Sequence, residues 1–397
     1  MSFSRRTFLE SICASAAVVP RPPAGAPLNI VFVLADDLGW SDLGVYGADL
    51  NETPNLDRFA ATAVRFTHAY AASPVCSPTR ASIMTGKHPA RLGMTVWHED
   101  AVNPPKDRRL LPAPSEANLP LSERTLAEIL HEGGYATGHV GKWHLGTSEY
   151  YPEAQGFDFN TGGTHWGAPA TYHYPFRGQV RAEYRYVPGL SWAKPGDYLT
   201  DQLTEQARRA IDFWGNKPFF LNLWHHAPHT PIQGKELDVR YFRAKLRPGK
   251  KQQQPAYAAM IRNLDENFGR VLDHIERAGI ADRTVVIFAS DNGGYVAPFE
   301  GKPIANNAPL RSGKGSLYEG GVRVPLLIRW PGVSKPSICD SPVLSMDLFH
   351  TILDAAGLPS GSGIHGLGLK PLLEYTQATL PRKELFFHYP HYYHAPK

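Results

Sequence analysis

The feature that most constrains the fold of this chain is an alternation between short apolar, β-branched runs and longer segments with helical periodicity. Asn29–Ala35 is the first apolar run, and a helix is predicted to open at Thr53-Pro54, where a capping residue precedes a proline. Further strands are predicted at 135–140, 219–224, 284–289 and 324–330, with helices at 122–132, 198–214, 257–278 and 346–356. This alternation predicts an α/β fold with a doubly wound, mostly parallel sheet flanked by helices.

Composition and charge exclude several classes of protein. The chain has 397 residues, of which 42% are hydrophobic and 20% charged, and this suits one large globular domain. Its formal net charge of +4 provides no basic field, so we expect no nucleic-acid partner. No stretch reaches about eighteen consecutive apolar residues, so we expect no membrane span in the mature protein.

The N-terminus has the pattern of an export signal. Arg5 and Arg6 precede a short apolar stretch at 12–19, which predicts a signal peptide of the twin-arginine type over residues 1–26. The alternative is an ordinary disordered, basic N-terminus. With a signal, the protein is exported to the periplasm or the extracellular space, and residues 27–380 form the catalytic domain. Only Cys76 and Cys339 then remain, too few for a disulfide scaffold.

Acidic and amide residues follow two of the predicted strands. Asp36 and Asp37 come directly after the first strand, and Asp291 and Asn292 come after the strand at 284–289. Ligands of open α/β sheets bind outside the carboxyl ends of the strands. Either pair by itself is more typical of a turn, but two pairs at corresponding strand ends favour a site for Ca²⁺, or Mg²⁺ in its place, because all four side chains are hard oxygen donors.

Three further segments carry candidate catalytic groups. Lys142 and His144 follow the strand at 135–140 and, in extended chain, would project into one cleft; a surface lysine beside a packed histidine is the alternative. His229 ends a block of three histidines that suggests zinc, although the carboxylates elsewhere favour a hard cation and leave a histidine free to donate protons. Lys314 lies between two glycines, as in a binding loop or a flexible surface loop.

Cys76 lies just before a predicted short helix. Pro78 suits the first turn of that helix, which places Cys76 at the helix N-terminus, where free N–H groups favour an anion. Such a location lowers the pKa of a thiol, so a thiolate nucleophile is one interpretation. A buried, inert cysteine is the other.

Together these blocks resemble the formylglycine-dependent sulfatases. Cys76-Ser77-Pro78-Thr79-Arg80 matches the C-x-P-x-R signature of that family, and GKWHLG at 141–146 matches its second signature. Six separated blocks agree in order, over roughly residues 28–390: Asp36-Asp37, the Cys76 block, GKWHLG, the His229 block, 291–294 and 313–324.

The resemblance implies an alkaline-phosphatase-like fold and the hydrolysis of a sulfate monoester. It implies that a dedicated maturation enzyme oxidises Cys76 to formylglycine, whose hydrate is the nucleophile. The implied roles are Ca²⁺ binding by Asp36, Asp37, Asp291 and Asn292 with the modified Cys76, orientation of that residue by Arg80, sulfate binding by Lys142 and Lys314, and proton transfer by His144 as base and His229 as acid.

The end of the chain and the substrate remain open at this stage. Members of the family usually continue into a small antiparallel C-terminal sheet, so we expect residues 381–397 to begin an incomplete subdomain whose last strand exposes an aromatic-rich edge. The substrate is a sulfated small molecule or glycan, and aromatic clusters at 164–174 and 387–394 favour a carbohydrate. The alternatives are a phosphonate monoester or phosphodiester hydrolase of the same superfamily, or a non-catalytic binder of sulfated glycan in which Cys76 is never oxidised.

Overall fold

The computed structural model describes residues 27–393, so the predicted signal peptide at 1–26 lies outside the described residues. The strands are β1 (Asn29–Ala35), β2 (Val64–Tyr70), β3 (Ala136–Gly141), β4 (Phe159–Thr161), β5 (Arg177–Val180), β6 (Glu183–Tyr186), β7 (Phe219–Trp224), β8 (Thr284–Ser290), β9 (Pro298–Phe299), β10 (Lys302–Pro303), β11 (Arg323–Arg329), β12 (Ser337–Cys339) and β13 (Val343–Leu344). The α-helices are α1 (Pro54–Ala60), α2 (Cys76–Thr85), α3 (Pro89–Leu92), α4 (His98–Val102), α5 (Leu126–Glu132), α6 (Leu199–Trp214), α7 (Glu236–Lys245), α8 (Pro255–Arg277), α9 (Glu319–Val322), α10 (Asp347–Ala356) and α11 (Lys370–Glu374).

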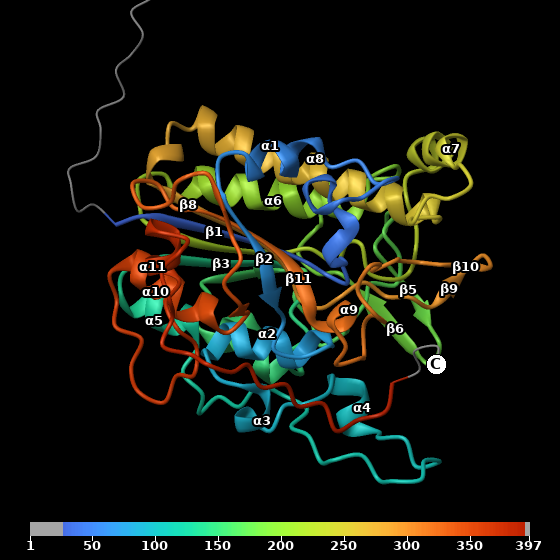
Figure 1. The fold of residues 1–397 in the computed structure, drawn as a ribbon, viewed down its shortest axis with the longest axis horizontal. Coiled ribbons are helices and arrows are strands. Elements are labelled where there is room, and N and C mark those ends of the chain that lie inside the picture. Colours follow the sequence, from blue (N-terminus) through green and yellow to red (C-terminus); the bar gives the residue numbers. More distant parts are fainter. Residues whose placement is uncertain (1–26, 394–397) are drawn as a thin grey trace, which may run out of the picture.

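The main sheet has the order β12-β2-β11-β8-β1-β7-β3-β4, and β13 also pairs with β2. Its neighbours are parallel except at β11, which is antiparallel to both β2 and β8. Helices cover both faces of this sheet, with α1, α6 and α8 on one side and α2, α5 and α10 on the other (Figure 1). The predicted doubly wound, mostly parallel sheet is confirmed.

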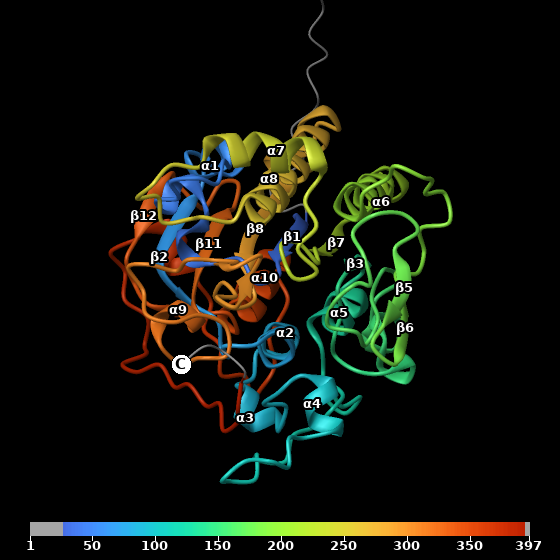
Figure 2. The same ribbon diagram turned by 90° about the vertical axis from the view of Figure 1, so that its right-hand side faces the viewer.

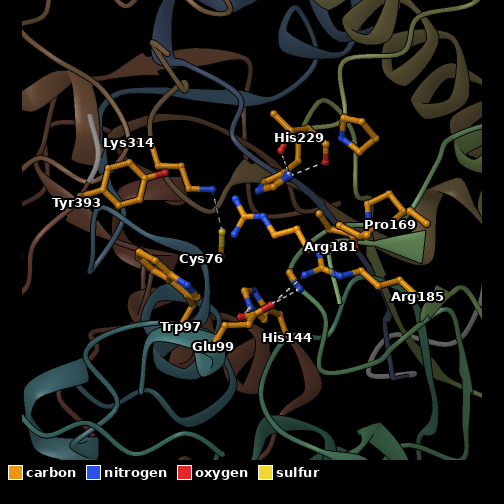
Figure 3. A pocket seen from close by; sticks show the side chains of 16 residues that line it. Cys76, Trp97, Glu99, His144, Pro169, Arg181, Arg185, His229, Lys314 and Tyr393 are labelled. Atoms are coloured by element: carbon orange, nitrogen blue, oxygen red, sulfur yellow. Dashed lines mark hydrogen bonds and ion pairs between the residues drawn. The ribbon is translucent and has the colours of Figure 1, made fainter. Parts of the chain in front are cut away.

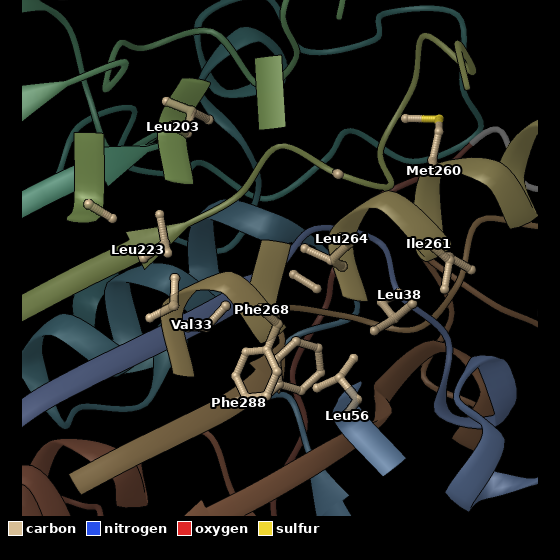
Figure 4. Packing of buried hydrophobic residues seen from close by; sticks show 14 of the residues in the cluster. Val33, Leu38, Leu56, Leu203, Leu223, Met260, Ile261, Leu264, Phe268 and Phe288 are labelled. Atoms are coloured by element: carbon tan, nitrogen blue, oxygen red, sulfur yellow. The ribbon is translucent and has the colours of Figure 1, made fainter. Parts of the chain in front are cut away.

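Successive side chains of β1 point to opposite faces of the sheet, so this strand contributes to a hydrophobic core on each face. Val31 and Val33 face one hydrophobic cluster, whereas Ile30 and Phe32 face the other, as the two-residue period of a strand requires. Figure 4 shows the first cluster, in which the Phe268 ring of α8 meets the Phe288 ring of β8 edge to face at 5.3 Å. Burial of a side chain of this kind stabilises the fold by about 1.5–3 kcal/mol.

The predicted element boundaries were close but not always right. The helix predicted from residue 122 begins only at Leu126, because Thr125 forms a capping box with Glu128. Several strands were not predicted, and β2 is the longest of them: it contains Arg65, Thr67 and other half-exposed residues between its buried ones, so it has no continuous apolar run. Edge-side strands of this type carry a weaker sequence signal than buried parallel strands.

The topology brings the motif blocks to one edge of the sheet. The neighbouring parallel strands β8, β1, β7 and β3 all end there, which places the residues that follow each strand side by side. Because β11 runs the opposite way, its first residue lies at this edge, together with the preceding loop that carries Lys314. The direction of β2 is the same as that of β8, so β2 also ends at this edge and leads into α2 and Cys76.

The C-terminal segment differs from the sequence-based expectation. Residues 381–393 contain no strand, so the expected edge strand was wrong for the part of this segment that is described. Its side chains pack on the preceding part of the fold instead: Phe387 meets Tyr70 with ring centroids 5.9 Å apart, and His391 Nε2 lies 2.8 Å from the hydroxyl oxygen of Thr95. That residues 381–397 begin a further subdomain stays a prediction.

Outside the main sheet, β5 and β6 form a separate two-stranded hairpin on the side of α5 and α6 (Figure 2). Within residues 27–393, no helix has the length and apolarity needed to cross a membrane.

Candidate active site

Cys76 is the first residue of α2 and lies at the floor of a pocket. Its side chain is buried, with Sγ 3.4 Å from Lys314 Nζ and 3.6 Å from Asp36 Oδ1. Burial raises the pKa of the Cys76 thiol to about 12, although Lys142 and Lys314 favour the thiolate. Burial thus opposes the thiolate form of Cys76, and its interpretation as a thiolate nucleophile stays a prediction.

The acidic residues of two strand ends meet beside Cys76. Asp36, Asp37 and Asp291 are buried, and the Asp37 N–H donates to Asp291 Oδ1 at 3.1 Å. Asn292 Nδ2 donates to Asp37 Oδ1 at 2.8 Å, whereas its own Oδ1 is buried and finds no hydrogen-bond donor among the described residues. An orphaned buried acceptor is costly by about 1–3 kcal/mol, and a hard cation would satisfy it.

A cluster that could hold a metal ion is therefore present. Ligand atoms of Asp36, Asp37, Cys76 and His229 lie within 4.8 Å of one another. Asp291 is outside this set of atoms, and its carboxylate is bound by Arg80. His229, which the resemblance assigns as a proton donor, thus also lies within ligand distance of the acidic pair.

Three buried cations match the three carboxylates. Arg80 binds Asp291 with Nε and Nη2 both 2.9 Å from Oδ2, and its guanidinium lies over the Trp224 ring at 5.1 Å. Lys142 Nζ lies 2.6 Å from Asp36 Oδ2, and Lys314 Nζ lies 2.7 Å from Asp37 Oδ1. Each of these carboxylates therefore already has a cation of the protein beside it.

The two lysines differ in their access to a substrate. Lys142 has no exposed surface, while Lys314 is 6% exposed and lines the pocket. His144 has a left-handed backbone, with φ of 61°, so the chain from Lys142 to His144 is not extended. The reasoning that placed both side chains in one cleft was wrong: His144 lines the pocket and Lys142 lies beneath it, against Asp36.

The two histidines occupy different surroundings. His229 Nε2 lies 3.4 Å from Asp37 Oδ2, and its Nδ1 lies 2.8 Å from the Thr230 carbonyl oxygen. His144 Nε2 lies 3.1 Å from Glu99 Oε2. Burial lowers the pKa of His229 to about 3, although the Asp37 carboxylate raises it. Burial likewise lowers the pKa of His144 to about 4, although the Glu99 carboxylate raises it. Burial thus opposes a positive charge on both rings, whereas the neighbouring carboxylates favour one.

Two glycines in the motifs allow neighbouring backbone segments to approach closely. A Cβ on Gly141 would lie 1.9 Å from the Trp224 carbonyl oxygen, and φ of 108° there also favours glycine. A Cβ on Gly293 would lie 1.9 Å from the Gly320 carbonyl oxygen. Gly293 therefore permits the close approach of the segment before β11.

Above this floor the pocket has a cavity of about 420 Å³, a size typical of small-ligand sites. Its floor is formed by Cys76, His144, His229 and Lys314, whereas Trp97, Glu99, Arg181, Arg185 and Tyr393 form a rim (Figure 3). Sequence reasoning missed the charged rim residues, which belong to no motif and come from α4 and the β5–β6 hairpin. Of the two aromatic clusters flagged in the sequence, one supplies Tyr393 and the other only the small residues of 167–170.

Comparisons with known proteins identify the family. The sulfatase family model matches residues 28–358. Human N-acetylgalactosamine-6-sulfatase is 35% identical over 94% of this chain and 69% of its own length, and human arylsulfatase A is 34% identical over 98% and 74%. The crystal structure of Ps i-CgsB in complex with k-i-k-neocarrahexaose superposes with a TM-score of 0.74 and 30% identity, covering 88% of this chain and 77% of that one. With the fold, the site and these similarities in agreement, the chain belongs to the sulfatase family.

Proposed function

We propose that this sulfatase hydrolyses a sulfate monoester carried by a carbohydrate, with formylglycine derived from Cys76 as the reactive group. The observation that carries the proposal is the position of Cys76: a buried first residue of α2 at the floor of the pocket, beside Lys314 and Asp36. A thiol with a raised pKa is a poor nucleophile there. A maturation enzyme would therefore have to oxidise it before turnover.

The hydrate of formylglycine would supply two hydroxyl groups, one to attack sulfur and one to help expel sulfate. His229 lies on the same carboxylate as Lys314, so it is placed to protonate the departing alcohol. His144 lies on another side of the pocket and is placed to remove the hydroxyl proton that permits release of sulfate. Lys314 and the N-terminus of α2 stabilise negative charge on the transferring group, and Arg80 holds the floor in register through Asp291 and the Lys142 carbonyl.

Glu99 positions His144 in this scheme. If Glu99 Oε2 accepts the Nε2–H, the lone pair of the ring lies on Nδ1, which is buried and has no hydrogen-bond partner among the described residues. A second oxygen of Glu99 lies 3.5 Å from the Gly167 N–H. We therefore assign proton acceptance to Nδ1 of His144 and orientation of the ring to Glu99.

Asp36, Asp37, Asp291 and Asn292 are the proposed ligands of a hard divalent cation, Ca²⁺ or Mg²⁺. The donor set is oxygen-rich, and the orphaned Oδ1 of Asn292 points to a ligand atom without a partner. When bound, such an ion would polarise the sulfate and the reactive group as a Lewis acid.

The rim supports a sugar as the alcohol. Trp97 and Tyr393 line the pocket with ring centroids 5.5 Å apart, and aromatic faces of this kind stack on sugar rings. The names of the similar proteins, an N-acetylgalactosamine-6-sulfatase and a protein crystallised with neocarrahexaose, agree with this choice. The arginine pair in the sequence at 5–6 supports export to the periplasm or extracellular space.

Two measurements test the proposal. Protein co-expressed with a formylglycine-generating enzyme should hydrolyse sulfated N-acetylgalactosamine and 4-nitrophenyl sulfate far faster than 4-nitrophenyl phosphate, and mass spectrometry should find an aldehyde at Cys76. Faster hydrolysis of the phosphate or a phosphonate monoester would favour the phosphoryl-transfer alternative. Full activity with an unmodified Cys76 would contradict the mechanism, and binding of sulfated glycan without turnover by matured protein would favour the binder.

A further inference from the structure

The rim of the pocket carries positive charge that the reaction at Cys76 does not use. Arg181 and Arg185 belong to the β5–β6 hairpin, and both line the pocket. Figure 3 shows the two side chains reaching inward from the hairpin, with Arg181 extended toward Cys76. These two arginines have different partners, and the difference indicates which of them is available to a ligand.

Arg185 is already paired. Its Nη2 lies 2.8 Å from Glu183 Oε2 and 4.0 Å from Glu99 Oε1, and its Nη1 donates to the Ala168 carbonyl oxygen at 3.4 Å. It faces Gly178 across the hairpin, where the absence of a side chain leaves space. Arg185 is therefore a fixed wall of the pocket, with its charge balanced by two carboxylates.

Arg181 is not paired. Within residues 27–393 its guanidinium has neither an ion-pair partner nor a hydrogen bond, and the residue is exposed. An unpaired guanidinium at the lining of a pocket is free to bind a planar anion through two parallel hydrogen bonds. Its charge is therefore available to a ligand without the loss of an internal contact.

The backbone at Arg181 is also unusual. Arg181 and Ala182 form the two-residue turn between Val180 and Glu183, and Arg181 has a φ of 54°. Turns of this kind favour glycine or asparagine, because other residues resist positive φ. An arginine held in this conformation at a pocket is the type of local strain that accompanies a functional position.

We propose that Arg181 forms a second anion subsite, which binds a sulfate or carboxylate group of the substrate other than the sulfate being removed. This inference rests on the proposed sulfatase function and narrows its substrate to sugars with at least two anionic groups. The scissile sulfate lies over Cys76 and Lys314, and the second group meets Arg181 at the hairpin. Arg185 ties the hairpin to the rest of the pocket through the Ala168 carbonyl oxygen and Glu99.

The test compares substrates with one and two negative groups. Matured wild-type enzyme, Arg181→Ala and Arg181→Lys are assayed with a monosulfated monosaccharide, the same sugar with a second sulfate, and a monosulfated disaccharide that contains a uronic acid. We expect Arg181→Ala to lower kcat/KM about tenfold for at least one doubly charged substrate and to leave the monosulfated sugar unchanged. Arg181→Lys should recover part of the loss, and added salt should weaken the wild-type preference.

The substrate that responds identifies the anion, since the disulfated sugar reports a sulfate and the disaccharide a carboxylate. Arg177→Ala, at an exposed arginine of the same hairpin outside the pocket lining, is the matched control and should leave every substrate unchanged. An equal loss of Arg181→Ala activity on singly and doubly charged substrates, or no loss on any of them, would overturn the proposal.

Failure of the sulfatase function itself would be distinct, because wild-type enzyme would then turn over none of the sulfates. In that case calorimetric binding of the disulfated sugar still tests the subsite. Tighter binding to wild type than to Arg181→Ala would support it, and equal affinity would overturn it.

Discussion

The floor and the rim of the pocket are built in different ways. The floor residues follow strands of the main sheet or begin a buried helix, and Cys76, Lys142 and Lys314 are at most 6% exposed. Each cation there has a carboxylate partner. The rim comes from α4, the β5–β6 hairpin and the C-terminal segment, and includes the exposed Arg181. In the proposed function, the buried floor carries out the chemistry and the more exposed rim selects the alcohol.

The strongest test of the floor is its nucleophile. We expect Cys76→Ala to lower activity at least about 10⁴-fold, the scale found when a catalytic nucleophile is removed. Cys339→Ala, at a buried cysteine outside the pocket lining, controls for loss of a thiol and should keep activity. Steady-state assays of matured protein measure both, and a Cys76→Ala enzyme within tenfold of wild type would refute the assignment.

Substitution of either histidine by alanine should lower the rate about 10²–10⁴-fold, but the two variants should be slow in different steps. His229→Ala should be worst for alcohols that leave poorly and least severe for 4-nitrophenyl sulfate, because an activated leaving group needs no proton. His144→Ala should release one equivalent of alcohol in a burst and then turn over slowly. Rapid-mixing kinetics distinguish the two, and a burst in the His229 variant alone would show that the roles are reversed.

Loss of the metal should cost about 10²–10³-fold in rate. Asp291→Ala should lose both metal and activity, and it should also lower stability by about 3–5 kcal/mol, because Arg80 would be left buried without its partner. Asn292→Ala removes an oxygen ligand without removing a charge. Elemental analysis should find one Ca²⁺ or Mg²⁺ per wild-type chain and less in either variant. Two zinc ions per chain would contradict the proposed site.

Glu99 on the rim orients His144 on the floor and does not itself transfer a proton. Glu99→Gln should therefore lower the rate only about tenfold. The Glu99 carboxylate raises the pKa of His144 against the effect of burial. Removing this charge lowers that pKa further, so the acid limb of the pH profile of kcat, which includes the release of sulfate, should move to lower pH. Glu183→Gln, which touches Arg185 and not His144, should leave the limb in place. An unshifted limb in Glu99→Gln would reduce Glu99 to a structural role.

The buried histidine His225 should make the folded protein modestly less stable at acid pH. Burial lowers the pKa of His225 to about 3, so between pH 6.5 and 3 the unfolded chain binds more protons at this residue and stability falls as pH falls. Between pH 6 and pH 5, wild type should lose about 1 kcal/mol more than His225→Asn in urea unfolding. His388→Gln is the control: it replaces an exposed histidine and should lose as much stability as wild type over this pH range. Equal losses in wild type and His225→Asn would contradict this account.

Much of the fold and floor could be predicted from local pattern. Apolar runs identified five of the buried strands, and the residues after them supplied Asp36, Lys142, His229 and Asp291. The longest strand that was not predicted, β2, has half-exposed residues between its buried ones, so the apolar pattern could not reveal it. Only the resemblance to sulfatases connected Cys76 with the other blocks. The reasoning that placed Lys142 and His144 in one cleft was wrong, because it assumed an extended chain and His144 has a left-handed backbone conformation.

By itself, the sequence determined the class of fold, the family and the chemical types at the floor, since strand ends and short motifs are local properties of the chain. Only the tertiary structure decided which charges neutralise each other, that the Cys76 thiol is desolvated, and that Glu99 and Arg181 reach the same pocket. The physical reason is that pKa values, ion pairs and pocket walls depend on distances between segments that lie far apart in the chain. The hairpin at 177–186 carries no sequence signal for a site until packing places it beside Cys76.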